Sequence, residues 1–232
     1  MTEIRGVHAG PVAIEQTEQG GAGDPAESPL GALLPGGRVR PGTAVSVGGD
    51  MPLLLALAAE VSAESSGWAA VGLPDLGALA AADAGLDVGA GLWVDEPGRQ
   101  WPQVLGTLLE AVPVVLAGPA PPAPARIARR LAAIMRRSGA VLLTAQPWEG
   151  ADLFLQVSSA EWIGIEHGFG VLRGRRVTVT ATGRGAAARP RQADLWLPGP
   201  DGSVTAAALP AAEPGSGARV PAVGRPALRV VG

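Results

Sequence analysis

The segment TAVSVGGDMPLLLALAAEV, residues 43–61, decides the fold class. Residues 43–47 are mostly apolar and predict a short buried strand, which ends at the pair Gly48 and Gly49. Pro52 suits the first turn of a helix, and leucine and alanine recur after it at helical spacing. A strand, a short glycine turn and a helix in this order begin a β-α-β unit.

The same alternation of strand and helix continues along the middle of the chain. Asp75 is the expected N-cap of the second helix, and Gly85 and Gly139 are expected to end helices. Because helical crossovers join parallel strands, we expect an α/β domain of three layers, with a mostly parallel sheet between helices. The further strands are predicted at residues 68–72, 91–94, 112–117 and 140–144, and the further helices at 75–83, 100–110 and 124–138.

After Gln146 the pattern changes to short apolar segments that are separated by turn residues. Such segments are typical of hairpins, and we expect them to extend one edge of the sheet as an antiparallel C-terminal part. The predicted strands are residues 152–157, 162–165, 176–182 and 193–197.

Both ends of the chain lack hydrophobic periodicity. Residues 1–28 are predicted to be a disordered N-terminal segment and residues 201–232 a flexible tail, which leaves one domain at 29–200. The end of the tail is apolar and basic, so it is either a strand that is added to a partner's sheet or an unstructured tail. Its candidate partner-binding residues are Val220, Val223, Leu228 and Val230.

The composition excludes several kinds of chemistry. The 232 residues include no Cys and no Lys, and all 18 basic residues are Arg. The chain therefore has no disulfide, no zinc–thiolate site, no Schiff-base lysine and no phosphate-loop lysine. The apolar runs are shorter than the roughly 18 residues of a spanning helix, and the start has no apolar signal region. We expect a cytoplasmic protein without a membrane partner, metal ion or cofactor.

The charge is distributed unevenly along the chain, although the net charge is only −3. Residues 1–110 hold 4 Arg against 14 acidic residues, whereas residues 111–232 hold 14 Arg against 7. A basic half indicates nucleic acid or an acidic partner. Two solvated halves that attract each other give the same pattern.

Two groups of arginines are candidate contacts for DNA phosphates or for an acidic partner. One group lies on the predicted helix at 124–138 and the other in a Gly-, Ala- and Pro-rich loop. A solvated helix face and a solubilising loop are the alternatives. The residues are Arg126, Arg129, Arg130, Arg136 and Arg137 on the helix, and Arg184, Arg189 and Arg191 in the loop.

Two tryptophans near loops or edge strands, Trp148 and Trp162, are candidate partner anchors. Tryptophan is enriched where proteins bind one another most strongly. Ordinary packing at the edge of the domain is the alternative for both.

Four segments in order resemble a RecA-type core: LGALLPGGRVRPGTAVSVGG at 30–49, GWAAVGLPDLGALAAADAGLD at 67–87, VPVVLAGP at 112–119 and GAVLLTAQ at 139–146. With Trp101-Pro102 and the late GRGAAARPR…LWLPGPDG at 183–202, the chain is most similar to the ImuA-prime group. Members of that group are accessory proteins of the DNA-damage mutasome.

This resemblance implies a RecA-like core and a role in error-prone translesion synthesis during the SOS response. The implied partners are an ImuB-like inactive Y-family polymerase and its associated error-prone polymerase, with weak DNA binding as an addition. A RecA-like inhibitor of cell division is an alternative role that also needs no nucleotide.

The chain departs from the ATPases of that superfamily at three places. The phosphate loop is short and lacks both its lysine and its Ser/Thr. The strand at 112–117 ends without the acid that orients magnesium, and Leu73 or Pro74 stands where a catalytic glutamate is expected. We expect neither ATP hydrolysis nor a small-molecule ligand, the alternative being a nucleotide-responsive regulator with a rewired phosphate site. The degenerate loop consists of Gly48, Gly49, Asp50, Met51 and Pro52.

Overall fold

The computed structural model describes residues 28–63, 67–166 and 169–207. Of the predicted N-terminal segment it describes only Ser28, and of the predicted tail only residues 201–207. The candidate anchors Val220, Val223, Leu228 and Val230 lie outside the described residues.

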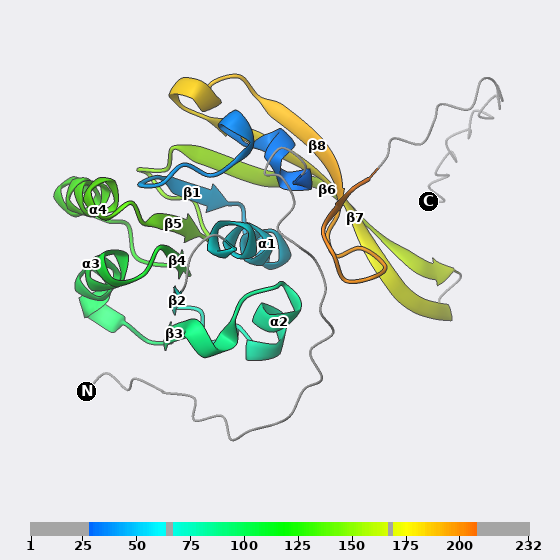
Figure 1. Ribbon diagram of the computed structural model, residues 1–232, viewed down its shortest axis with the longest axis horizontal. Helices are drawn as coiled ribbons and strands as arrows, with labels where there is room; N and C mark the ends of the chain where they lie inside the picture. Colours follow the sequence, from blue (N-terminus) through cyan, green and yellow to red (C-terminus); the bar gives the residue numbers. More distant parts are fainter. Residues whose placement is uncertain (1–27, 64–66, 167–168, 208–232) are drawn as a thin grey trace, which may run out of the picture.

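The described strands form one sheet of nine strands in the order β3-β2-β4-β5-β1-β6-β7-β8-β9 (Figure 1). Neighbouring strands from β3 to β6 are parallel, and β7, β8 and β9 each run antiparallel to the preceding strand. The strands are β1 (Ala44–Val47), β2 (Trp68–Val71), β3 (Gly91–Val94), β4 (Val114–Ala117), β5 (Val141–Thr144), β6 (Leu153–Glu166), β7 (Phe169–Gly183), β8 (Arg191–Trp196) and β9 (Thr205–Ala206).

Helices cover both faces of the parallel part of this sheet, which confirms the predicted three-layer α/β class (Figure 1). On one face lie α1 (Met51–Ser62), α2 (Ala78–Asp83) and the 3-10 helix η1 (Pro29–Leu33). On the other face lie α3 (Trp101–Ala111) and α4 (Ala125–Ser138). Among the described residues, no helix combines the length and apolar character needed to cross a membrane.

A contact between η1 and α1 closes the first of these layers. Ser28 caps η1 and donates a hydrogen bond from Oγ to Oε2 of Glu60 on α1 at 2.7 Å. Burial raises the pKa of Glu60, and this hydrogen bond opposes the rise. The N-terminal 3-10 turn is therefore fixed to the same helix that follows β1.

The helix end predicted at Gly139 agrees with the structure, whereas the helix start predicted at Asp75 does not. Gly139 ends α4 in the left-handed conformation, at φ +79°, as expected. The N-cap of α2 is Gly77 and not Asp75, so that prediction was wrong. The reason is a tight turn before the helix, in which the Leu76 N–H donates to the Leu73 carbonyl and delays the first helical turn.

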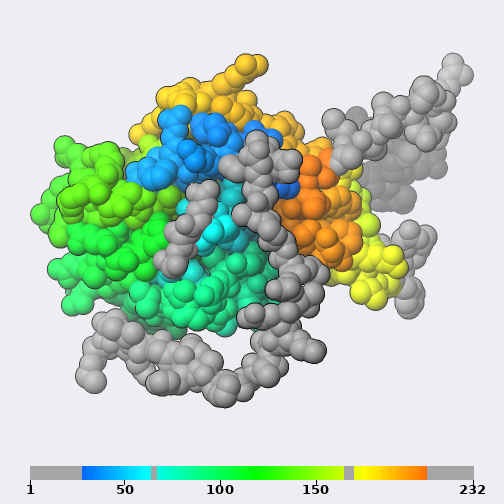
Figure 2. Space-filling view, viewed as in Figure 1, coloured from blue at the N-terminus to red at the C-terminus, as the bar shows by residue number. Residues whose placement is uncertain are grey.

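The C-terminal part differs more from the prediction. The two strands predicted at 152–157 and 162–165 are one long strand, β6, which begins at Leu153 and whose pairing with β7 shifts register after Val157 and after Ile163. Because β6 runs parallel to β1, the antiparallel part begins only at β7. The far end of this β6–β7 hairpin extends past the rest of the described chain (Figures 1 and 2). β9 continues the sheet beyond residue 200, where we had placed the start of the tail.

The carboxyl ends of β2 and β4 approach each other closely. The Gly118 N–H donates to the Val71 carbonyl at 2.8 Å. A Cβ at Gly118 would lie 1.9 Å from the carbonyl oxygen of Gly72. The position that follows β4 therefore has no room for any side chain.

Replacing Gly118 with alanine is expected to destabilise the fold by about 2 kcal/mol or more, because backbone and not a flexible side chain must move. Urea unfolding measures this. The control is Gly106→Ala in α3, where a Cβ would lie 3.4 Å from the Ile134 side chain. Its gain in helix propensity keeps the change within about 1 kcal/mol. Equal midpoints for the two variants would contradict the prediction.

Candidate functional site

In the turn between β1 and α1, the backbone N–H groups of both glycines donate to carbonyl groups of the protein itself. The Gly48 N–H donates to the Leu155 carbonyl at 2.9 Å. The Gly49 N–H donates to the carbonyls of Val47 and Ala145, at 2.7 and 2.8 Å. A phosphate loop works by turning such N–H groups toward the phosphate oxygens. Here both glycine N–H groups are already hydrogen-bonded to neighbouring strands.

A carboxylate stands at the start of α1, where a phosphate would lie in an active nucleotide site. Asp50 is the N-cap of α1 and accepts a hydrogen bond from the Leu53 N–H at 3.1 Å. Pro52, the second residue of the helix, has no N–H to offer. The negative charge favoured at a helix N-terminus is thus supplied by the protein itself.

Arg175 of β7 holds this carboxylate in a two-pronged ion pair. Its Nη1 lies 3.1 Å from Asp50 Oδ1, and its Nη2 lies 2.5 Å from Oδ2. The two side chains are only 12% and 11% exposed. The sequence predicted a turn between strand and helix at these residues but did not single out Arg175 as the partner of Asp50, 125 residues away.

A cavity of about 780 Å³ opens at the carboxyl ends of β2, β4 and β5, on the side of α3 and α4. Two tryptophan rings line it, with the ring of Trp101 edge-to-face against that of Trp148 at a centroid separation of 6.2 Å. Trp148 is half-buried here. Its ring is therefore part of the cavity wall, and its role as an anchor for a partner stays a prediction.

A buried hydroxyl network positions Trp148. Ser46 of β1 and Thr144 of β5 share a hydrogen bond of 2.9 Å between their hydroxyl groups. The backbone N–H of Trp148 donates to Ser46 Oγ at 2.9 Å, and Thr144 Oγ1 donates to the Gln146 carbonyl at 2.8 Å. The short loop after β5 is thereby fixed to the sheet, with Gln146 on the cavity wall.

The remaining polar lining of the cavity comes from the loop after β3 and from the loop after β5. Asp95 and Arg99 contribute from the first loop, and Glu149 from the second. Among the described residues, no three His, Asp or Glu side chains lie close enough together to bind a metal ion. No local pattern in the sequence singles out Arg99. It reaches this edge of the sheet because it follows the parallel strand β3.

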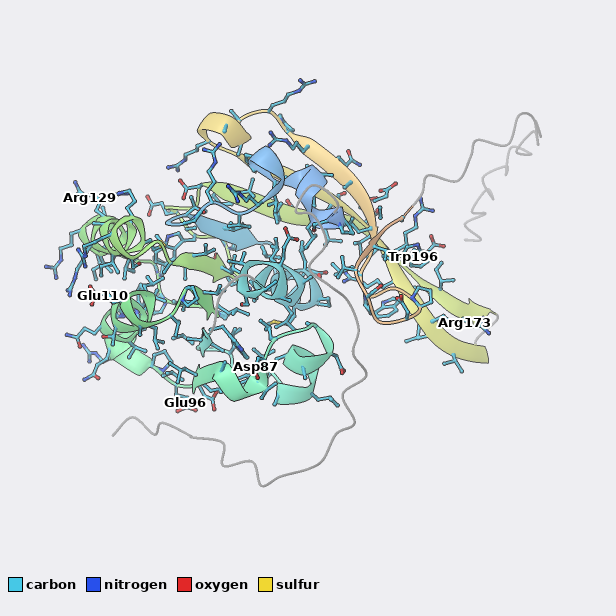
Figure 3. The ribbon with its side chains drawn as sticks, in the orientation of Figure 1. Asp87, Glu96, Glu110, Arg129, Arg173 and Trp196 are labelled. Carbon is cyan, nitrogen blue, oxygen red and sulfur yellow. The ribbon has the colours of Figure 1, made fainter. Side chains whose placement is uncertain are left out.

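All five predicted arginines of α4 are exposed (Arg129 is labelled in Figure 3). Arg137 pairs with Glu110 of α3 at 2.6 Å, at the surface. Arg129 donates from Nε to the Ala125 carbonyl of its own helix. Arg126 and Arg130 line a second cleft of about 530 Å³, together with Arg99.

The arginine loop before β8 is more ordered than its composition suggests. Ala187 is buried within a 3-10 turn. Arg191 was predicted to lie in the loop but is the first residue of β8, because it already pairs with Ala181 of β7, and it donates to the Ala186 carbonyl at 3.4 Å. Arg184 donates to the carbonyl of Glu149 at 3.3 Å, which brings this loop to the β5–β6 connection and not to α4. Arg189 is exposed. The two predicted arginine groups therefore occupy separate surfaces.

The far end of the β6–β7 hairpin carries large exposed apolar side chains: Trp162, Ile163, Val171 and Leu172. The Trp162 side chain is 51% exposed, and the Arg175 guanidinium lies 6.0 Å from its ring centroid. Arg173 also lies on the hairpin, at the opposite end of the molecule from α4 (Figure 3). Trp162 thus has the exposure that an anchor for a partner needs.

Comparison with known proteins gives two matches. Residues 32–150 match the protein family described as the MT3502 N-terminal domain. The chain is also 32% identical over 177 residues to the uncharacterized protein Rv3395c of Mycobacterium tuberculosis. This alignment covers 70% of the chain and 84% of Rv3395c. The family match runs from β1 to β5 and so includes the β1–α1 turn and the cavity, whereas Arg175 and the hairpin lie beyond it.

Asp50→Asn is expected to destabilise the protein by about 3 kcal/mol, because asparagine still caps the helix but leaves the buried Arg175 charge unpaired. Glu110→Gln is the matched control. It breaks the Arg137 pair, whose side chains are 66% and 55% exposed, and should cost less than about 1 kcal/mol. Thermal and urea unfolding measure both. Similar losses in the two variants would contradict a special role for the buried pair.

Proposed function

The chain belongs to the MT3502 N-terminal domain family, and on this premise we propose that it is a non-catalytic, RecA-like adaptor of the ImuA-prime type. It acts in the cytoplasm within a DNA-damage mutasome that carries out error-prone translesion synthesis. It binds an ImuB-like inactive Y-family polymerase and, through it, the associated error-prone polymerase. Exposed arginines on α4 add weak contact with DNA phosphates.

The observation that carries this proposal is the closed turn between β1 and α1. Asp50 and Arg175 neutralise each other at the helix start, and the N–H groups of Gly48 and Gly49 already have acceptors. A triphosphate would have to break the ion pair and displace the carboxylate before any oxygen reached the helix. This argues against the alternative of a phosphate-loop regulator.

The end of β4 supports the same conclusion. An ATPase of this superfamily would carry an acid for magnesium at the end of this strand, as the resemblance implies. Gly118 follows the strand, and a side chain there would collide with the carbonyl of Gly72. Restoring an acid at Gly118 is therefore sterically excluded without rearrangement of β2.

The hairpin end supports the adaptor part of the proposal. Exposed apolar side chains that gather on one projecting element are typical of a protein-binding surface. Arg173, which is exposed on the same hairpin, adds a guanidinium group of the kind that is enriched at such interfaces.

The full chain is expected to release no phosphate from ATP and magnesium above a protein-free blank, with or without single-stranded DNA. Malachite-green detection measures this. The physical reasons are the missing lysine, the Gly48 and Gly49 N–H groups that already have acceptors, and the missing magnesium acid. Turnover that copurifies with the chain through two different chromatographic steps would overturn the non-catalytic assignment.

Trp162→Ser and Val171→Ser are each expected to weaken binding to the purified ImuB-like polymerase by at least about 10-fold, as removal of a central apolar anchor does. Surface plasmon resonance measures the affinity. Leu79→Ser on α2 is the matched control, since Leu79 is 74% exposed and Val171 is 75% exposed. Unchanged affinity in both hairpin variants would remove the hairpin from the interface.

A further inference from the structure

The cavity and the arginine cleft between α3 and α4 share one residue, Arg99. We propose that together they bind one nucleotide, with its base beside Trp101 and Trp148 and its phosphate on Arg99, Arg126 and Arg130. This site is separate from the closed β1–α1 turn and needs no hydrolysis. It does not depend on the adaptor role, but it deepens the proposed phosphate contact of α4 by assigning that contact to Arg126 and Arg130.

The cavity has the size and the lining of a site for a flat aromatic group. Its volume of about 780 Å³ lies within the usual range of small-molecule sites, roughly 300–1,000 Å³. It opens outside the carboxyl ends of parallel strands, where open α/β sheets bind ligands. Its wall includes the Trp101 and Trp148 rings and Leu105, and aromatic side chains are the usual stacking partners of bases.

Polar groups in the same wall can recognise the edge of a base. Asp95 and Glu149 offer carboxylates that accept hydrogen bonds from exocyclic amino groups, and Gln146 both donates and accepts. These carboxylates repel a phosphate, so the charged part of the ligand must lie elsewhere.

The adjoining cleft supplies that place. Its lining contains Arg99, Arg126 and Arg130 but no carboxylate. Over residues 28–63, 67–166 and 169–207, none of the three side chains makes an ion pair or a hydrogen bond, unlike Arg137 and Arg175, which are paired. Guanidinium groups bind phosphate oxygens with two parallel hydrogen bonds, which suits them to this ligand.

The test uses the full chain and two probes, a fluorescein-labelled single strand of about 12 nucleotides and a free mononucleotide. One variant combines Arg99→Gln, Arg126→Gln and Arg130→Gln. The control combines Arg129→Gln, Arg136→Gln and Arg137→Gln, which removes the same number of positive charges, all from α4 and outside the cleft. Fluorescence anisotropy measures the affinity for the oligonucleotide. Quenching of tryptophan fluorescence measures the binding of either probe to the wild type and to Trp148→Phe.

We expect the cleft variant to lose at least about 10-fold in affinity and the control to lose less than about 3-fold. We also expect ligand-induced quenching to fall in Trp148→Phe. Binding of the oligonucleotide alone would identify the ligand as an unpaired nucleotide of a strand, and binding of both probes as a nucleotide in either form. Absence of binding by both probes, equal losses in cleft and control variants, or quenching that Trp148→Phe leaves unchanged would overturn the proposal.

Discussion

The ion pair between Asp50 and Arg175 joins the two parts of this protein. Asp50 begins the helix after the central strand β1, and Arg175 lies on β7, in the antiparallel extension. The pair therefore holds the extension against the parallel core, and its carboxylate occupies the N-terminus of α1. It is also one case in which the acidic first half of the sequence pairs with the basic second half. The described residues form three ion pairs. Two of them, Asp50 with Arg175 and Glu110 with Arg137, join an acid of residues 1–110 to an arginine of residues 111–232.

The parallel core was predictable because its signals are local. Apolar runs, Pro52 and Gly139 fix each strand or helix within a few residues, and helical crossovers then dictate parallel pairing. The hairpin was less predictable, because β6 keeps pairing through two register shifts that interrupt its alternation. The Asp50–Arg175 contact and the Trp101–Trp148 contact depend on the tertiary fold, and no spacing in the sequence encodes them.

The sheet separates two environments that an active nucleotide enzyme would combine. On the side of α1, the position expected for phosphate is occupied by the protein's own carboxylate. On the side of α3 and α4, the same edge of the sheet keeps an open cavity, bounded by the loops after β3, β4 and β5. The lack of lysine affects these two sides differently. It removes the phosphate-loop chemistry, whereas arginine can still bind phosphate in the cleft beside α4.

The length of the β6–β7 hairpin has a consequence for its backbone as well as for its side chains. β6 pairs with β1 only through Leu155, and β7 pairs with β8 only from Arg176 onward. The backbone of Arg175 still bonds to Leu197 and Pro198, and past that residue the hairpin is a two-stranded ribbon with no strand of the sheet on its outer sides. Such an edge is the kind that invites another chain to pair. The register shift after Ile163 interrupts the regular hydrogen-bond ladder there, and irregularities of this kind make an edge a poorer template for indiscriminate pairing. A partner that adds a strand must match an irregular ladder, which favours selective recognition over self-association.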